Sequence, residues 1–309
     1  MTKPLLSIVI ANYNYGDYLE EAVQSIANQV DVDKVELIIC DAGSTDNSVD
    51  IIKKYANGLP PNTFYSSWIS SVTPPPCHVA TFPLITWWCS EKDGGQSAAF
   101  NKGFLHARGK WLTWLNADDL MLPGTVAAFV KLVSRHRGSK WVTGNKLAFD
   151  STTRRIIDVN WGPHIQPPLL RGRKAFREVY GPTTFWRRAL YYEMGPIDEQ
   201  LHYAMDSEYW ARLTMAGIRQ TRLNHICWGF RIHPRSKTEG EQSQEVKDRR
   251  QREMAYWIEK THYIFPQRLS NPYYLLWIIW RIVDGSWISR IFCKCYFIDR
   301  QLDVLYKNK

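Results

Sequence analysis

The first part of the chain alternates between two hydrophobic patterns. Continuous apolar runs with β-branched residues predict strands buried on both faces, expected at 5–11, 35–40, 84–89 and 111–115. Between them, apolar residues recur three or four positions apart, which predicts helices at 17–29, 46–56 and 96–107. Strands that alternate with helices in this way are typical of a parallel α/β sheet.

The rest of the chain has a less regular pattern. It predicts helices at 123–137 and 203–217, strands at 140–145 and 223–232, and a charged helix at 241–261. Residues 58–83 are rich in proline and have no period, so we expect a surface insertion there. We therefore divide the chain into an α/β domain at 1–240 that contains this insertion, and a helical, Trp-rich extension at 241–309.

Composition narrows the class of protein. The chain has 309 residues, of which 45% are hydrophobic and 22% charged, as expected for a globular protein with a sizeable core. Its six cysteines are scattered without a CxxC pair, so they predict neither a disulfide framework nor a zinc site. Met1 to Pro4 lead straight into a strand with no signal-peptide pattern. We expect a reducing, cytoplasmic location.

Charge is distributed unevenly along the chain. The formal net charge is +9, but the first 130 residues are net acidic and residues 131–190 are strongly basic. Acidic residues at strand ends suit a metal ion. The basic middle segment suits an anionic substrate, a phosphate or a membrane surface, or it is simply a solvated face.

Polar clusters follow three of the predicted strands. Tyr13 is flanked by asparagines, Asp41 follows the second strand, and Asn116, Asp118 and Asp119 follow the fourth. Ligands of such sheets bind beyond the carboxyl ends of the strands. The chain has neither a GxGxxG nor a GxxxxGK[ST] motif, so dinucleotide and P-loop sites lose their main support.

These clusters are suited to a nucleotide diphosphate. Tyr13 could cover an aromatic base, and the Asp41 carboxylate could accept the imide N–H of uracil. Asp118 and Asp119 offer the oxygen ligands that Mg²⁺ or Mn²⁺ prefers. Alternatively, one of these two aspartates caps the helix that begins near Pro123.

Four segments in order carry a resemblance to a known family: "SIVIANYNYGDYLEEAVQSI", "VELIICDAGSTDNSVDIIKKY", "EKDGGQSAAFNKGFLHARGKWLTWLNADDLMLPG" and "DEQLHYAMDSEYWARLTMAG". The chain is similar to glycosyltransferase family 2 from about Leu5 to Lys237, apart from the insertion. The resemblance implies a GT-A fold of the α/β class, with a Rossmann-like, mostly parallel sheet flanked by helices. It also implies an inverting, Mg²⁺- or Mn²⁺-assisted transfer of a sugar from a nucleotide diphosphate, expected to be UDP, to a hydroxyl group.

The resemblance assigns roles residue by residue. Asp206 matches the general base. The nucleotide-sugar contacts it implies are Ala11, Tyr13, Asp41, Asn101, Lys102, Asn116 and Asp118. The metal ligands it implies are Asp118, Asp119 and His233, and the acceptor-side residues are Thr183, Thr184 and Trp186. Trp186 either stacks on a sugar ring or packs in the core, and His233 is either a ligand or a surface residue. Asn116 and Ala42 stand where the family often has aspartate.

The expected partners are a nucleotide-sugar donor and a glycan or lipid-linked acceptor, with no nucleic acid. The apolar stretch within residues 272–297 is too short for a membrane span, which needs about 20 residues. These residues either lie on an anionic membrane at its inner face, with Trp277, Trp280 and Trp287 at the interface, or pack against the α/β domain. Alternative activities are a nucleotidyltransferase and a nucleotide-sugar-binding module without turnover. A glycosidase would not need Asp41.

Overall fold

The computed structural model describes residues 3–57, 84–162, 179–237, 243–262 and 272–307, the side chains of 272–277 and 307 excepted. The 58–83 insertion lies outside the described residues. The strands are β1 (Leu6–Asn12), β2 (Val35–Asp41), β3 (Ile85–Ser90), β4 (Trp111–Asn116), β5 (Leu120–Met121), β6 (Trp141–Asp150), β7 (Ile156–Asn160), β8 (Thr184–Arg187) and β9 (Gln220–Ile232). The helices are α1 (Gly16–Ala27), α2 (Ser48–Ala56), α3 (Gln96–His106), α4 (Thr125–Arg135), α5 (Arg188–Met194), α6 (Met205–Met215), α7 (Gln244–Thr261), α8 (Pro272–Val283), α9 (Ser286–Phe297) and α10 (Val304–Lys307).

All nine strands belong to one sheet with the order β3-β2-β1-β4-β8-β6-β9-β5, and β7 pairs with β6. The first four strands in this order are parallel, which confirms the α/β pattern predicted for the N-terminal half. Beyond them, β8 runs antiparallel to both β4 and β6, whereas β6 and β9 are parallel. β6 therefore points in the same direction as β1 and β4.

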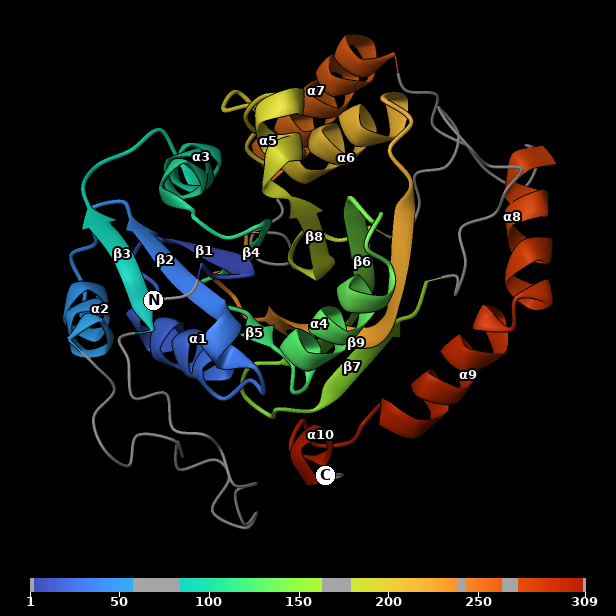
Figure 1. The fold of residues 1–309 in the computed structure, drawn as a ribbon, viewed down its shortest axis with the longest axis horizontal. Coiled ribbons are helices and arrows are strands. Elements are labelled where there is room, and N and C mark those ends of the chain that lie inside the picture. The colour runs from blue at the N-terminus through green and yellow to red at the C-terminus, as the bar shows by residue number, and fades with distance from the viewer. Residues whose placement is uncertain (1–2, 58–83, 163–178, 238–242, 263–271, 308–309) are drawn as a thin grey trace.

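The alternation of side chains along β1 explains the layers of helices. Leu6, Ile8 and Ile10 are buried in one core together with residues of α1, α2 and α4, whereas Val9 lies in a second core with α3, α5 and α6. Successive strand residues point to opposite faces of a sheet, so a continuous apolar run needs cover on both sides. Figure 1 shows these helices on either side of the central strands.

Tryptophans fill the second core. Trp114, Trp141, Trp186 and Trp210 are each at most 1% exposed, and the rings of Trp114 and Trp210 stack with centroids 5.4 Å apart. Trp257 of α7 is buried in the same core. The first helix of the predicted C-terminal extension thus packs as part of the α/β domain.

The C-terminal helices α8 and α9 lie along the side of the molecule that carries β7 (Figure 1). They confirm that the segment 272–297 is helical, broken near Gly285. Within the described parts of the chain, no helix combines the length and the apolar character needed to cross a membrane.

Candidate active site

The three polar clusters predicted at strand ends converge at one edge of the sheet. β1 pairs with β2 on one side and with β4 on the other, which sets Asn12 beside Asp41 and Ala11 beside Asn116. Tyr13 follows directly and is 57% exposed. Because these strands are parallel, their carboxyl ends form the edge at which open α/β sheets bind ligands.

The Asp41 carboxylate organises the loop after β2. It is buried and accepts hydrogen bonds from Asn12 Nδ2 at 2.7 Å, from the hydroxyls of Ser44 and Ser90, and from the backbone N–H groups of Gly43 and Ser44. Burial raises the pKa of Asp41, but these hydrogen bonds outweigh burial and hold the pKa below its ordinary value. A carboxylate accepts about four hydrogen bonds. In this arrangement Asp41 has no lone pair left for the predicted bond to a base.

The loops after β1 and β2 are tied to each other, which fixes the position of Tyr13. Ser44 Oγ accepts a hydrogen bond from the Asn14 backbone N–H at 2.8 Å, and Asn14 Oδ1 accepts one from the Thr45 N–H at 2.8 Å. Asp46 accepts a bond from the N–H of Gly16 at the start of α1. The exposed Tyr13 ring therefore stands on a rigid double loop.

Asp118 and His233 come together from opposite parts of the chain. Asp118 lies in the turn between β4 and β5, and His233 directly follows β9. His233 Nε2 lies 3.0 Å from Asp118 Oδ2, whereas His233 Nδ1 is buried with no described hydrogen-bond partner. The Tyr18 ring covers the imidazole with centroids 4.5 Å apart. His233 is 4% exposed, so the alternative of a surface histidine is wrong.

Asp119 faces the interior rather than a ligand. Its side chain is fully buried and accepts hydrogen bonds from the Arg231 backbone N–H at 2.9 Å and from Asn116 Nδ2 at 2.7 Å. Burial, together with the nearby Asp118 charge, raises the pKa of Asp119. The prediction that Asp119 ligates a metal alongside Asp118 does not fit this geometry. Asp119 instead fixes the turn that carries Asp118.

The Arg231 side chain also points into the interior. It is 2% exposed, its Nε donates to the Asp118 carbonyl at 2.6 Å, and its guanidinium pairs with Glu21 of α1 at 2.5 Å. Arg235 pairs with Asp17 at 3.0 Å on the surface. The positive charge next to the two aspartates therefore has a structural role.

A polar chain connects Asn116 to the C-terminal side of the site. Asn116 Oδ1 accepts a hydrogen bond from Gln96 Nε2 at 3.0 Å, and Gln96 Oε1 accepts one from Lys237 Nζ at 2.8 Å. Burial lowers the pKa of Lys237 to about 8, although Glu253, Asp206 and Asp118 oppose the shift. One ammonium group thus lies within the fields of the predicted base and of the predicted metal ligand.

Asp206 lies in the first turn of α6, partly buried. Its Oδ1 accepts a hydrogen bond from the Ser207 N–H at 2.7 Å, and Oδ2 has no donor among the described residues. Burial raises the pKa of Asp206, while the hydrogen bonds from Ser207 and the charge of Lys237 limit the rise. A carboxylate with a raised pKa and one free oxygen is suited to accept a proton.

Glu253 of α7 supports the segment that carries Asp206, a role that the sequence did not reveal. Its carboxylate accepts hydrogen bonds from the backbone N–H groups of His202, Tyr203 and Ala204 at 3.0, 2.6 and 3.1 Å. These three residues lead directly into α6. The signal in the sequence was spacing, because Glu253, Trp257 and Thr261 recur every four residues and form the buried stripe of α7.

Two residues predicted to bind the nucleotide sugar have other partners. Asn101 is 5% exposed, and both ends of its amide bind the 191–199 segment, including the N–H and C=O of Ile197. Lys102 forms an ion pair with Glu91, just past the end of β3, at 2.8 Å. The prediction for Asn101 is wrong because its amide is saturated, and the Lys102 ammonium is held by a carboxylate of the protein.

The predicted acceptor-side residues lie in the core. Thr183 and Thr184 are fully buried, and both hydroxyls donate to the Tyr180 carbonyl at 2.8 and 2.9 Å. Trp186 is fully buried on β8, and its ring lies 5.3 Å from Trp114 and 5.4 Å from Trp210. Of the two alternatives for Trp186, packing in the core is correct, and stacking on an acceptor sugar is wrong.

The residues present fit a metal ion that is held jointly by the protein and a bound diphosphate. In the ranges that the structure describes, no group of three or more His, Cys, Asp or Glu side chains could hold a metal ion. Asp118 and His233 do converge, with His233 Nε2 facing Asp118 Oδ2 at 3.0 Å. Mg²⁺ is often held by one or two carboxylates together with substrate phosphates. The pair suits a cation bound together with a diphosphate.

Comparison with known sequences identifies related proteins. The family model described as "Glycosyl transferase family 2" matches residues 7–67 and 84–191. An uncharacterized glycosyltransferase, alr2836 of Nostoc sp., is 32% identical over 127 residues, which cover 41% of this chain. The match spans only 32% of the length of that relative.

Solved structures share the fold. TarS of S. aureus in complex with UDP-GlcNAc matches with a TM-score of 0.56 and 15% identity, over 99% of this chain and 76% of that chain. The mannosyltransferase PcManGT from Pyrobaculum calidifontis, in complex with GDP-Man and Mn²⁺, matches with a TM-score of 0.56 and 16% identity, over 96% and 82% of the respective chains. These likenesses confirm the GT-A fold.

Proposed function

The chain belongs to glycosyl transferase family 2, and from this premise we propose that it moves a sugar from a nucleotide diphosphate, UDP in the first instance, to a hydroxyl of a glycan or lipid-linked acceptor with inversion. One observation carries the proposal: Asp118 meets His233 at 3.0 Å, and Asn116 beside them is linked through Gln96 to Lys237 by hydrogen bonds of 3.0 and 2.8 Å. The neighbouring folds that bind UDP-GlcNAc and GDP-Man support a nucleotide-sugar donor.

In this proposal Asp206 is the general base. Its free Oδ2 takes the proton of the acceptor hydroxyl as that oxygen attacks the anomeric carbon, and the bond to the diphosphate breaks on the opposite face. The raised pKa of Asp206 brings the carboxylate closer to the operating pH. Lys237, held by Gln96, adds positive charge beside the reacting groups.

Asp118 and His233 would hold a divalent cation on the diphosphate side. When bound, such a cation offsets the charge that develops on the leaving diphosphate. The complex of PcManGT with GDP-Man and Mn²⁺ supports a metal in this fold. Tyr13, exposed at the end of β1, would cover the base, and the buried Asp41 holds the loop after β2 by its hydrogen bonds.

Nucleoside diphosphate release from a panel of nucleotide sugars, with Mn²⁺ and with EDTA, tests this function. We expect a UDP-linked sugar to release UDP only with the metal, and a hydroxyl acceptor to accelerate the release. Release of pyrophosphate instead would indicate a nucleotidyltransferase. Metal-dependent UDP binding without release from any donor would indicate a binding module, and either result would contradict the proposal.

We also propose that α9 lies on a membrane surface. Trp287, Ile288, Ile291 and Phe292 are exposed on one face of this helix, at 48%, 64%, 43% and 68%. Apolar residues that cluster on one side of a surface helix suit the interface of a bilayer. Two basic residues of α8 and α9 have partners within the protein. Arg281 is buried and donates to the Trp161 carbonyl, and Lys294 pairs with Asp158 at 2.6 Å.

The variant with Ile288→Ser and Phe292→Ser should therefore float with liposomes less well than the parent chain, since both exposed side chains are removed from the apolar face. Burying a large apolar side chain contributes about 1.5–3 kcal/mol, so the loss should be at least tenfold in partition. A control with Val30→Ser and Leu105→Ser removes two exposed apolar residues elsewhere. If both variants float like the parent, α9 does not bind the membrane.

A further inference from the structure

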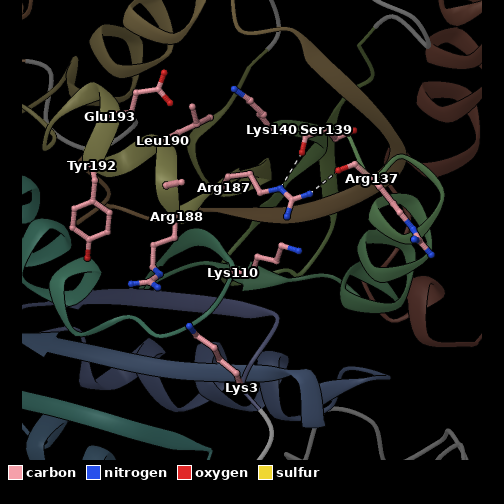
Figure 2. Close-up of a pocket in the computed structure, with 12 residues that line it drawn as sticks. Lys3, Lys110, Arg137, Ser139, Lys140, Arg187, Arg188, Leu190, Tyr192 and Glu193 are labelled. Carbon is pink, nitrogen blue, oxygen red and sulfur yellow. Dashed lines mark hydrogen bonds between the residues drawn. The ribbon is translucent and has the colours of Figure 1, made fainter.

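A basic pocket of about 800 Å³ lies away from the candidate active site (Figure 2). Six of its lining residues are basic: Lys3, Lys110, Arg137, Lys140, Arg187 and Arg188. Among the lining residues, only Glu193 is acidic. The volume falls within the range of about 300–1,000 Å³ that is typical of small-molecule sites.

The topology places this pocket at the opposite edge of the sheet from the active site. Lys3, Lys110 and Lys140 precede β1, β4 and β6, which all point in the same direction. Arg187 ends the antiparallel strand β8 and therefore reaches the same edge. The candidate active site lies at the carboxyl ends of β1, β2 and β4, so the two sites do not share residues.

Two of the three arginines of the pocket, Arg187 and Arg188, hold its walls in place. Arg187 Nε and Nη2 donate to the carbonyls of Ser139 and Arg137 at 3.0 and 2.9 Å, as the dashed lines in Figure 2 show. The Arg187 guanidinium also lies over the Trp111 ring, 4.4 Å from its centroid. Arg188 Nε donates to the Gly109 carbonyl at 3.0 Å. The turns that carry Lys110 and Lys140 are thus fixed before any ligand arrives.

Backbone hydrogen bonds and a buried carboxylate add to this rigidity. The N–H groups of Arg187 and Arg188 donate to the carbonyls of Lys140 and Lys110 at 2.9 and 3.0 Å. On the other side of the same turn, the buried Glu36 carboxylate accepts the Gly109 N–H at 2.9 Å. A preorganised wall lowers the entropic cost of binding.

The charges in the pocket are not neutralised within the protein. None of the six basic side chains forms an ion pair with a carboxylate of the described residues. Six positive charges around one cavity favour a multiply charged anion there. Arginine forks and lysine ammonium groups are the side chains that bind phosphate oxygens.

We infer that this pocket binds a ligand carrying two or more phosphate groups, separately from the nucleotide-sugar site. One phosphate would leave most of the six positive charges without a counterion. A lipid headgroup with two phosphate groups, as in cardiolipin, and a free polyphosphate compound offer the same oxygens, so either could supply the phosphates. The inference stands on the pocket alone and holds even if the chain transfers no sugar.

Calorimetry of the full chain with tripolyphosphate tests the inference. EDTA is present so that metal-dependent binding at the nucleotide-sugar site does not contribute. We expect one site per chain in the parent. In the Lys110→Ala, Lys140→Ala variant, affinity should fall by about tenfold or more, because two charge-assisted contacts are lost. The matched control, Lys53→Ala with Lys247→Ala, removes two exposed charges outside the pocket and should bind nearly as the parent does.

Vesicles that contain cardiolipin, whose headgroup carries two phosphate groups, distinguish the two sources of phosphate. If tripolyphosphate and the Lys110→Ala, Lys140→Ala change both reduce vesicle binding, the pocket accepts a lipid headgroup. If they do not affect vesicle binding but tripolyphosphate still binds, its ligand is a free phosphate compound. No binding of tripolyphosphate, equal affinity in the pocket variant, or an equal loss in the control variant would overturn the inference.

Discussion

The Asp206→Asn variant is expected to bind UDP as the parent chain does and to transfer sugar about 10²- to 10⁴-fold more slowly. Asparagine keeps the oxygen that accepts the Ser207 N–H, so the first turn of α6 remains intact. It removes the basicity of the free oxygen, which is the property that the proposed mechanism needs. Transfer rate at saturating donor and calorimetric UDP affinity with Mn²⁺ are the two measurements.

Ser207→Ala is the matched control, because it removes the neighbouring hydroxyl but leaves the carboxylate in place. It should transfer sugar at close to the parental rate. The parent should also lose activity as the pH falls through the raised pKa of Asp206, at a pH above the ordinary carboxylate value of 3.8. A folded Asp206→Asn protein that transfers within about threefold of the parent would be incompatible with general-base catalysis by this residue.

The Asp118→Ala and Asp119→Ala variants should have different effects. The sequence alone predicts a metal ligand at both positions, and therefore the same loss of metal-dependent UDP binding. Asp118 faces His233 near the surface, so its removal should weaken Mn²⁺-dependent UDP binding by at least the roughly 10- to 100-fold that even indirect changes to metal sites cost. Asp119→Ala leaves the Arg231 N–H and the Asn116 amide buried without their acceptor. It should lower the free energy of unfolding by about 1–3 kcal/mol for each unpaired group.

Calorimetry with and without Mn²⁺, together with denaturant unfolding, separates these outcomes. Asp118→Ala should unfold like the parent, and the metal-independent part of its UDP affinity should persist. Unchanged Mn²⁺-dependent affinity in Asp118→Ala would refute its assignment to the metal. Parental stability in Asp119→Ala would show that its two hydrogen bonds do not support the turn.

The hydrophobic pattern of the sequence predicted the parallel strands of the N-terminal half and the edge of the sheet that carries the site. β1, β2, β3 and β4 and the helices between them follow directly from apolar periods, and the parallel order brings Asn12, Asp41 and Asn116 to one edge. The type of a residue, however, does not show which hydrogen bonds its side chain already makes within the protein. Asp41 and Asn101 have the expected chemistry, but the protein itself occupies their hydrogen-bonding capacity, and Asp119 is fully buried.

Short strands and contacts between distant parts of the chain could not be predicted from the hydrophobic pattern. β8 has only four residues, and the resemblance implied an acceptor-side segment there rather than a strand. Its pairing with β4 and β6, which buries Trp186, depends on contacts between distant parts of the chain. The basic pocket likewise gathers residues from four separate segments of the chain, and the charge excess at 131–190 was equally compatible with an anion, a membrane surface or a solvated face.

The contact between Glu253 and the 202–204 backbone has a consequence for making hybrid enzymes. A junction at residue 240, as the composition suggests, would pair one protein's α6 with another protein's α7. Three N–H groups ahead of Asp206 would then depend on a foreign helix for their acceptor. Recombination with related enzymes should therefore keep α7 with the GT-A core and exchange segments only after Thr261.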